Sequence, residues 1–345
     1  MTAPADRIPA APASASATPS AGAPAGDGPP ADGPPGARLG AGVWVALGIV
    51  YVVWGSTYLA IRIALETMPS FLSAAARFLT AGLLLAGFVA VRHGPSALRV
   101  DLRQLGSAAL VGGLLLTGGN GLVVLGENSI PSGLAALLVA AVPLWMVLLT
   151  AAGGDRPKRA ELAGVLLGLV GLGVLSAPAI GGDIAPVGVI AVIVATVTWA
   201  LGSFASKRIR MPANVFTSSA YQMLAGGLGN TLIGLARGEE HGLRLGDVST
   251  RSWLALGCLV VFGSLVAFTA YAWLLRSAPL TLVATYAYVN PVVAVLLGWL
   301  VLSEPLTGPT LLGGAIVVAG VCLVVSVSRS PGRPSRRRSA GRSAR

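Results

Sequence analysis

From Ala41 to Val327 the chain is a succession of long apolar segments separated by short polar, proline-containing or glycine-containing breaks. Crossing the hydrocarbon core of a bilayer takes a helix of about 20 residues, and most of the segments have this length. We therefore predict ten membrane-spanning helices, at about 42–65, 69–91, 105–126, 130–152, 160–178, 185–205, 213–236, 252–274, 279–302 and 308–327.

The segments are continuously apolar, which is typical of an all-α membrane protein rather than a transmembrane barrel, whose strands read as ~10-residue alternating segments. Composition agrees: 54% of residues are hydrophobic and 11% are charged, against roughly 25% charged in soluble domains. A soluble enzyme is excluded on this ground. The two cysteines, Cys258 and Cys322, are too few for a disulfide scaffold.

Two tails flank the apolar region. Residues 1–40 are rich in alanine, proline and glycine and hold few large apolar residues. Such a segment cannot offset its ordering entropy, so we predict a disordered tail, and it lacks the apolar core of a signal peptide. Residues 328–345 form a basic tail that we expect to be cytoplasmic.

Lysine and arginine are distributed unequally between alternate loops. The loops on the side of the N-terminus hold ten such residues; the opposite loops hold three, all in one loop, namely Arg237, Arg244 and Arg251. Cytoplasmic loops carry the excess of these residues. The sequence thus predicts a multi-pass protein of the cell (plasma or inner) membrane with both termini in the cytoplasm.

The net charge is +11, and the last tail, from Arg329 to Arg345, holds seven arginines. This tail has two interpretations: a topology anchor in water, or a site for anionic lipid head groups. It lacks interleaved aromatic residues, so no nucleic-acid partner is expected.

The chain contains an internal repeat. When 129–157 is laid over 277–305, nine of 29 positions are identical, including three prolines in register. The run Trp54–Ser56 similarly matches Trp199–Ser203. The repeat predicts two halves of five helices, 41–178 and 179–327. Because five is odd, the second half enters the membrane inverted, as in secondary transporters that work by alternating access.

Three stretches carry a family resemblance: VVWGSTYLAIRIALETMPSFLSAAARFL (Val52 to Leu79), IPSGLAALLVAAVPL (130–144) and ATYAYVNPVVAVLLGWLVLSEPL (284–306). With them the chain resembles the drug/metabolite transporter superfamily and, within it, the EamA-domain family and its YedA-type exporters. The resemblance covers about 42–327. It implies ten helices in two EamA repeats that export small metabolites or drugs.

Several polar and aromatic residues fall at mid-membrane depth in the predicted spans. Uncharged hydrogen-bonding groups and aromatic faces suit amphiphilic or zwitterionic solutes. The alternative for each is helix–helix contact or an interfacial aromatic belt. The predicted cavity residues are Trp54, Ser56, Thr57, Arg77, Asn120, Trp199, Gln222, Tyr271, Tyr286, Tyr288 and Asn290.

Arg77 is the charged residue of greatest interest, because it lies about two turns into the second span. A buried arginine is expensive and points to a functional site. It could hold a substrate carboxylate, or it could snorkel or pair with Glu66 or Glu127. No acid lies at the centre of a span, so proton coupling has no support from the sequence; Glu127 is the nearest candidate.

Proline and glycine positions make two further predictions. Pro143 and Pro291 occupy equivalent positions of the repeat, where a proline removes a helical hydrogen bond. They are either hinges facing the cavity or passive kinks. Gly164, Gly168 and Gly171 share one helix face, and Gly313 and Gly320 do the same in the tenth span, which predicts close helix packing.

The leading functional hypothesis is a solute exporter of the membrane; an importer or exchanger is the alternative. An intramembrane enzyme would need paired mid-span aspartates or a His/Glu ligand set, and the spans show neither. We expect no metal or other cofactor. The expected partners are a small-molecule substrate and the lipid bilayer, with the chain acting as a monomer or weak homodimer.

Overall fold

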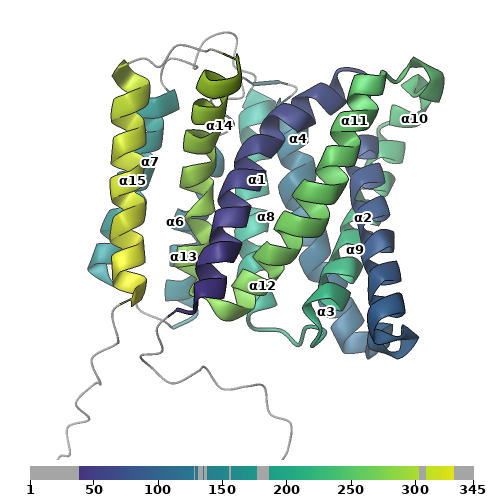
Figure 1. Cartoon of the computed structure of the whole chain (residues 1–345), viewed down its shortest axis with the longest axis horizontal. Helices are drawn as coiled ribbons and strands as arrows, with labels where there is room; N and C mark the ends of the chain where they lie inside the picture. The colour runs from purple at the N-terminus through teal and green to yellow at the C-terminus, as the bar shows by residue number, and fades with distance from the viewer. Residues whose placement is uncertain are drawn as a thin grey trace, which may run out of the picture. The chain divides into compact units, whose positions relative to one another are not determined.

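The computed structural model describes residues 39–127, 129–130, 135, 138–154, 157–176, 186–302 and 308–329, and every regular element in them is helical (Figure 1). The elements are α1 (Ala41–Leu65), α2 (Ser70–His93), η1 (Pro95–Leu98), α3 (Leu102–Gly112), η2 (Gly113–Gly121), α4 (Leu122–Glu127), α6 (Val142–Ala152), α7 (Arg159–Ser176), α8 (Pro186–Ser206), α9 (Val215–Ala236), α10 (Glu239–Gly242), η4 (Leu245–Asp247), α11 (Thr250–Cys258), η5 (Leu259–Phe268), α12 (Thr269–Ser277), α13 (Leu280–Ala284), α14 (Tyr286–Leu302) and α15 (Gly308–Arg329). The two predicted tails lie outside the described residues except at their inner ends.

Each predicted apolar segment contains helix in the described residues, so the all-helical fold is confirmed. Among these residues, five continuous helical stretches are long and apolar enough to cross a membrane: Ala41–Leu65, Ser70–His93, Leu102–Gly126, Pro186–Ser206 and Thr250–Ser277. Shorter apolar helices occupy the fourth, ninth and tenth predicted segments. The number of ten membrane crossings stays a prediction.

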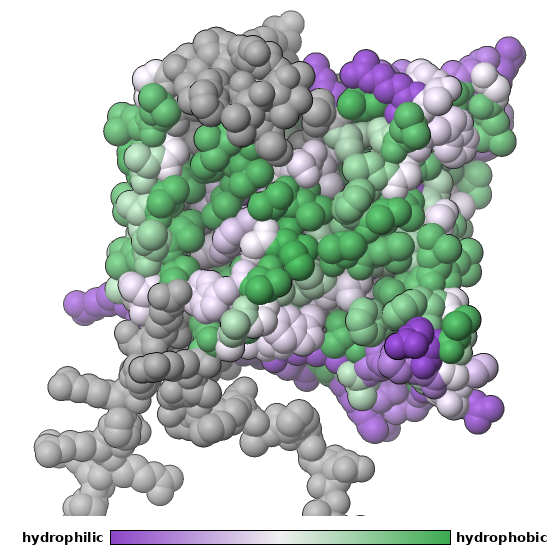
Figure 2. All heavy atoms as spheres, viewed as in Figure 1, coloured by the Kyte–Doolittle hydropathy of each residue, from purple (hydrophilic) through white to green (hydrophobic). Residues whose placement is uncertain are grey.

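The outer faces of the helices are apolar. Large hydrophobic side chains on five helices are more than half exposed: Leu83, Leu110, Val187, Leu232 and Leu254. Figure 2 shows hydrophobic residues across the middle of one face and hydrophilic residues gathered at its two ends. Exposing an apolar surface of this extent is unfavourable in water but not in lipid. The surface therefore fits a membrane-embedded protein.

The fifth and tenth predicted spans, α7 and α15, pack against each other through glycines. A Cβ atom on Gly164 would lie 2.8 Å from Val324, and one on Gly171 would lie 2.6 Å from the backbone nitrogen of Val317. The residue numbers rise along one helix and fall along the other, so the pair is antiparallel. The predicted role of these glycines in close packing is confirmed.

The second and seventh spans, α2 and α9, form a similar antiparallel pair. Gly82 faces Leu224, and Gly227 faces Leu79. Two further contacts are related by the repeat. The first span, α1, packs on the ninth, α14, and the sixth span, α8, packs on the fourth, α6. Helices that correspond in the repeat therefore make corresponding contacts.

The third and eighth spans share an unusual backbone. Each begins and ends as an α-helix but is π-helical in the middle, over Gly113–Gly121 in η2 and over Leu259–Phe268 in η5. The π-helix usually occurs as a single turn, frequently at functional sites. Two longer π-helical stretches at equivalent positions of the repeat indicate a functional region of the bundle.

The loop after α9 stabilises the start of α2. The Glu239 carboxylate of α10 accepts hydrogen bonds from the backbone N–H groups of Phe71 (2.9 Å) and Leu72 (3.0 Å). A carboxylate at a helix N-terminus satisfies unpaired N–H groups and interacts favourably with the helix dipole. Glu239 thus ties the loop between two helices to α2.

We expect Glu239→Ala to lower the free energy of unfolding by about 1 kcal/mol, as the loss of a helix cap usually does. The measurement is the apparent melting temperature of the purified protein in detergent. Glu240→Ala is the matched control. The one described ion pair of Glu240 joins its Oε1 to Nδ1 of the exposed His241 (3.2 Å). Equal melting temperatures for both variants would contradict the capping role.

Candidate functional site

A cavity of about 100 Å³ lies among helices of both halves of the chain. The first half lines it with residues of α1, α2, η2, α4 and α6, and the second half with residues of α8, η5 and α14. Its wall is mainly apolar, and its polar side chains are Thr57, Arg77, Asn120, Thr196 and Asn290. A few polar groups in an apolar concave surface are the usual composition of small-molecule sites.

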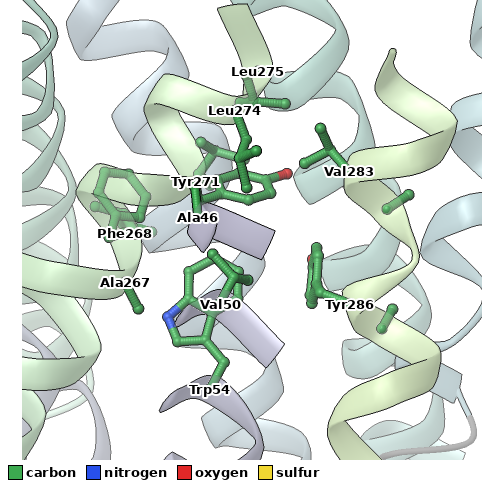
Figure 3. Packing of buried hydrophobic residues seen from close by; sticks show 14 of the residues in the cluster. Ala46, Val50, Trp54, Ala267, Phe268, Tyr271, Leu274, Leu275, Val283 and Tyr286 are labelled. Atoms are coloured by element: carbon green, nitrogen blue, oxygen red, sulfur yellow. The ribbon is translucent and has the colours of Figure 1, made fainter. Parts of the chain in front are cut away.

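Four aromatic residues, three of which line the cavity, pack against one another at its wall. The ring centroid of Trp54 lies 5.6 Å from that of Trp199, 5.1 Å from Tyr271 and 5.0 Å from Tyr286. The Trp199 and Tyr286 rings stand edge-on to Trp54, the arrangement that aromatic quadrupoles favour. Figure 3 shows Trp54, Tyr271 and Tyr286 converging from three helices.

Hydrogen bonds fix the orientation of these rings. Trp54 donates from Nε1 to the carbonyl oxygen of Gly263 in η5 (3.1 Å). Trp199 donates to the Tyr271 hydroxyl (2.9 Å), which lies 2.6 Å from the Ser203 hydroxyl. Since buried polar tips of aromatic residues need partners, this network holds the cavity wall in one conformation.

Arg77 lies in the wall of the cavity and is 6% exposed. Its Nε donates to the Ser264 hydroxyl (2.9 Å). In the part of the chain that the structure describes, no carboxylate lies within ion-pair distance of it. Glu66, one of the two predicted partners, is 3.9 Å from Arg251 instead, and the Glu127 side chain lies outside the described part.

A second, smaller chamber of about 20 Å³ adjoins the cavity and shares Arg77 and Asn120 with it. It extends to Leu65 and Ser73, at the end of the bundle where α1 ends and α2 begins. Arg77 therefore lies between the main cavity and the space that leads toward this end.

α1 and α14 are joined beside the cavity. The Tyr51 hydroxyl lies 2.5 Å from the Thr285 hydroxyl. With its amide in the orientation that satisfies both ends, Asn290 donates to the carbonyl oxygens of Tyr286 (3.1 Å) and Tyr51 (3.2 Å). Asn290 thus links the two helices where each contributes to the wall.

The structure brings most of the predicted site residues together. The residues that line the cavity are Trp54, Thr57, Arg77, Asn120, Trp199, Tyr286 and Asn290. Tyr271 is fully buried and packs against the aromatic rings of this wall. Trp54, Thr57 and Ile61 fall on one face of α1 because they are three and four residues apart.

The structure places three predicted residues elsewhere. Ser56 is exposed and donates to the Val53 carbonyl (2.8 Å). Tyr288 is buried between α14 and α7 and donates to the Val165 carbonyl (2.9 Å). Both follow a wall residue by two positions, which on a helix turns them to the opposite face. Gln222 is buried at the contact of α9 with α3 and donates to Ser218 (3.0 Å).

The two prolines occupy different positions in their helices. Pro143 lies in the first turn of α6, after a turn at Ala140 and Ala141. A proline in a first turn removes no helical hydrogen bond, so the predicted weakening of the helix does not arise there. Pro291 lies inside α14, one residue after Asn290, where it does remove one.

The pattern of apolar residues did not indicate the π-helical stretches or the wall residues that they supply, Gly119, Gly263 and Phe268. A glycine-rich run at 112–121 was the available signal for η2. A Cβ on Gly119 would lie 2.5 Å from the Trp199 ring, so only glycine leaves room for that ring. No comparable signal marks η5, whose sequence LVVFGSLVAF holds one glycine.

The family model for EamA-like transporters matches residues 41–177 and 186–326, which together make up most of the chain. The chain belongs to the EamA-like transporter family. It holds two copies of the EamA domain, and the cavity lies between them. The sequence-based assignment to this family is thereby confirmed.

Curated relatives cover almost the same region. The inner membrane transporter YedA of Escherichia coli, itself uncharacterised, is 38% identical over 81% of this chain and 89% of its own length. A probable terminal-alkyne amino-acid exporter of Streptantibioticus cattleyicolor is 29% identical over 83% of this chain and 94% of its own. A probable amino-acid metabolite efflux pump of Escherichia coli is 26% identical over 80% and 92%, respectively.

A solved crystal structure of a protein aligns with a TM-score of 0.69 and 22% identity, covering 85% of this chain and all of the other. At this identity the likeness concerns the fold alone. The transporter assignment rests on the EamA match and on the relationship to YedA.

Proposed function

We propose that this EamA-family protein is a secondary transporter that exports small metabolites or drugs across the cytoplasmic membrane by alternating access. The observation that carries the proposal is the cavity itself, because both EamA copies line it. In transporters built from inverted repeats, the substrate site lies at the repeat interface near the bilayer midplane. The relatives' names as transporters and exporters favour transport over enzymatic activity.

The proposed architecture is ten membrane helices in two inverted repeats of five. The antiparallel packing of α2 with α9 and of α7 with α15 supports it. Helices that correspond in two repeats run in opposite directions only if one repeat is inverted relative to the other. The exchange of equivalent contacts between the halves supports the same symmetry. We propose that both termini are cytoplasmic and that a monomer or weak homodimer is the working unit.

The packing around the cavity suggests which way it opens. On α1, the residues before Trp54 are tightly packed, with Val43, Leu47 and Val50 at most 5% exposed. On the other side of the cavity, the smaller chamber leads toward Leu65. With the N-terminus in the cytoplasm, the cavity in this conformation is closed toward the cytoplasm, and the smaller chamber continues it toward the outside. Rearrangement of the two repeats would reverse that arrangement.

Efflux from proteoliposomes tests the proposal. Liposomes containing the purified full-length protein are loaded with radiolabelled L-phenylalanine, L-threonine or ethidium, which represent aromatic, polar and cationic solutes. The two amino acids are chosen because two relatives are named for amino-acid export. We expect at least one solute to leave faster than from protein-free liposomes. Release at the protein-free rate for all three would contradict the proposal, and faster uptake than release would favour an importer.

Pro291 is the proposed hinge in α14. Pro291→Ala restores a backbone donor inside the helix and should stiffen it, so we expect several-fold slower efflux at normal membrane abundance. Pro143→Ala is the matched control, because Pro143 lies in the first turn of α6, and we expect near-normal efflux. Wild-type efflux by both variants would make the two prolines passive kinks.

A further inference from the structure

We infer that the cavity binds a solute with a carboxylate and an apolar or aromatic body, and that Arg77 pairs with the carboxylate. The inference rests on the proposed function, because it takes this cavity to be the substrate site. It adds a charge preference: the site selects anions over matched amides and amines.

Arg77 has hydrogen-bonding capacity to spare. A guanidinium carries five N–H donors, and the one described hydrogen bond of Arg77 joins its Nε to Ser264. Its nearest aromatic contact is Phe78, whose ring centroid lies 4.9 Å away. Arginine prefers to bind carboxylates through two parallel N–H groups, and the Nη groups remain for such a contact.

The charge of Arg77 is also uncompensated among the described residues. Burying a cation in a low-dielectric environment is unfavourable unless an opposite charge lies near it. An arginine that served packing alone would be replaced by an apolar residue at lower cost. A bound anion would supply the missing charge, and it would do so only while substrate occupies the cavity.

Gly263 places the cation next to the aromatic wall. A Cβ on Gly263 would lie 2.7 Å from Arg77 Nη2, so the guanidinium rests directly against η5. The carbonyl of the same glycine accepts the Trp54 indole N–H (3.1 Å). A carboxylate on Arg77 would therefore have the body of its molecule beside Trp54, and Thr57 lies in the same wall.

The described wall holds no other charged side chain. Its other polar side chains, Thr57, Asn120, Thr196 and Asn290, are uncharged, so Arg77 is the only charged residue among the described wall residues. A cationic solute would face repulsion from Arg77 that a low dielectric strengthens. An anion of the same shape would be attracted by the same charge.

Three probes with one phenylpropyl body separate charge from shape: the anion hydrocinnamate, the neutral hydrocinnamamide and the cation phenylpropylamine. Binding to the full-length protein in liposomes is followed by tryptophan fluorescence, since Trp54 and Trp199 line the cavity. We expect the anion to bind about tenfold more tightly, or better, than either other probe, as suits a charge-assisted bidentate contact.

Substitutions of Arg77 test its role in the preference for the anion. Arg77→Gln should abolish the preference for the anion, and Arg77→Lys should retain part of it, because a lysine keeps the charge but loses the bidentate geometry. Arg62→Gln on the exposed side of α1 is the matched control and should behave as the wild type. If Arg77→Gln fails to fold, Gly263→Ala tests the anion preference in its place. Its added methyl displaces the flexible end of Arg77 without removing the charge.

The outcomes distinguish this inference from the proposed function. Equal affinity for the three probes, preference for the amine, no binding of any probe, or an unchanged preference in both Arg77→Gln and Gly263→Ala would overturn the anion site, whatever the efflux assay shows. Arg77-dependent binding of hydrocinnamate by a protein that moves no solute would support the anion site and contradict transport.

Discussion

Replacing Ala195 by phenylalanine is expected to stop efflux while the protein still folds. Ala195 lies in the cavity wall on α8 and is 1% exposed. A phenyl ring at this position fills much of a cavity of about 100 Å³ and leaves little room for a solute. Overpacking typically costs about 1–3 kcal/mol, and the ring has a cavity to enter, so we expect reduced stability but normal assembly.

The matched control is the neighbouring residue on the same helix. Val194 is 43% exposed on the outer face of α8, so Val194→Phe adds the same ring away from the cavity. The measurement is efflux of the solutes that the wild-type protein moves, with gel filtration to confirm folding. Wild-type efflux by a folded Ala195→Phe variant would show that the substrate passes elsewhere.

Gly112→Ala is expected to prevent folding, or to destabilise the protein more than Gly113→Ala or Gly263→Ala. α3 crosses α9 at this glycine, and an added Cβ would lie 2.7 Å from the Cα atom of Gln222. The obstacle is backbone, which cannot rotate away as a side chain can. The cost should therefore exceed the ~1–3 kcal/mol of ordinary overpacking.

Gly113→Ala provides the comparison, because nothing lies within 4 Å of a Cβ at that position. Both variants make the same chemical change one residue apart. We expect Gly113→Ala to give wild-type yield and melting temperature, and Gly112→Ala to give little monodisperse protein. Similar yields would mean that α3 and α9 do not approach as closely as the structure shows.

The helices themselves were accessible to sequence analysis because membrane helices are long and uniformly apolar. The predicted start and end of the first span, 42 and 65, agree with α1 at Ala41–Leu65. The π-helical character of η2 and η5 was not accessible, since a change from i+4 to i+5 hydrogen bonding leaves the apolar pattern almost unaltered. The glycine run in η2 shows where such a change is tolerated, but not that it occurs.

The chemical type of the cavity residues could be predicted from the sequence, but the direction in which each side chain points could not always be predicted. Trp54, Arg77 and Tyr286 combine chemistry unusual for a membrane span with positions near its middle, and they line the cavity. Tyr288 has equally suitable chemistry yet contacts α7. The rotation of each helix is set by packing between distant segments, such as the fit of Tyr288 against Gly168, and composition does not reveal it.

The most direct test of alternating access measures whether the cavity can be reached from each side of the membrane. A single cysteine replaces Asn120 in a protein in which Cys258 and Cys322 have been changed to serine. Right-side-out and inside-out vesicles are treated with a membrane-impermeant thiol reagent, and a cysteine at exposed Val194 reports labelling from within the lipid. Alternating access predicts that the cysteine at position 120 reacts from both sides, and that the solutes moved in the efflux assay slow the reaction. Reaction from neither side, or from one side only with or without those solutes, would contradict it.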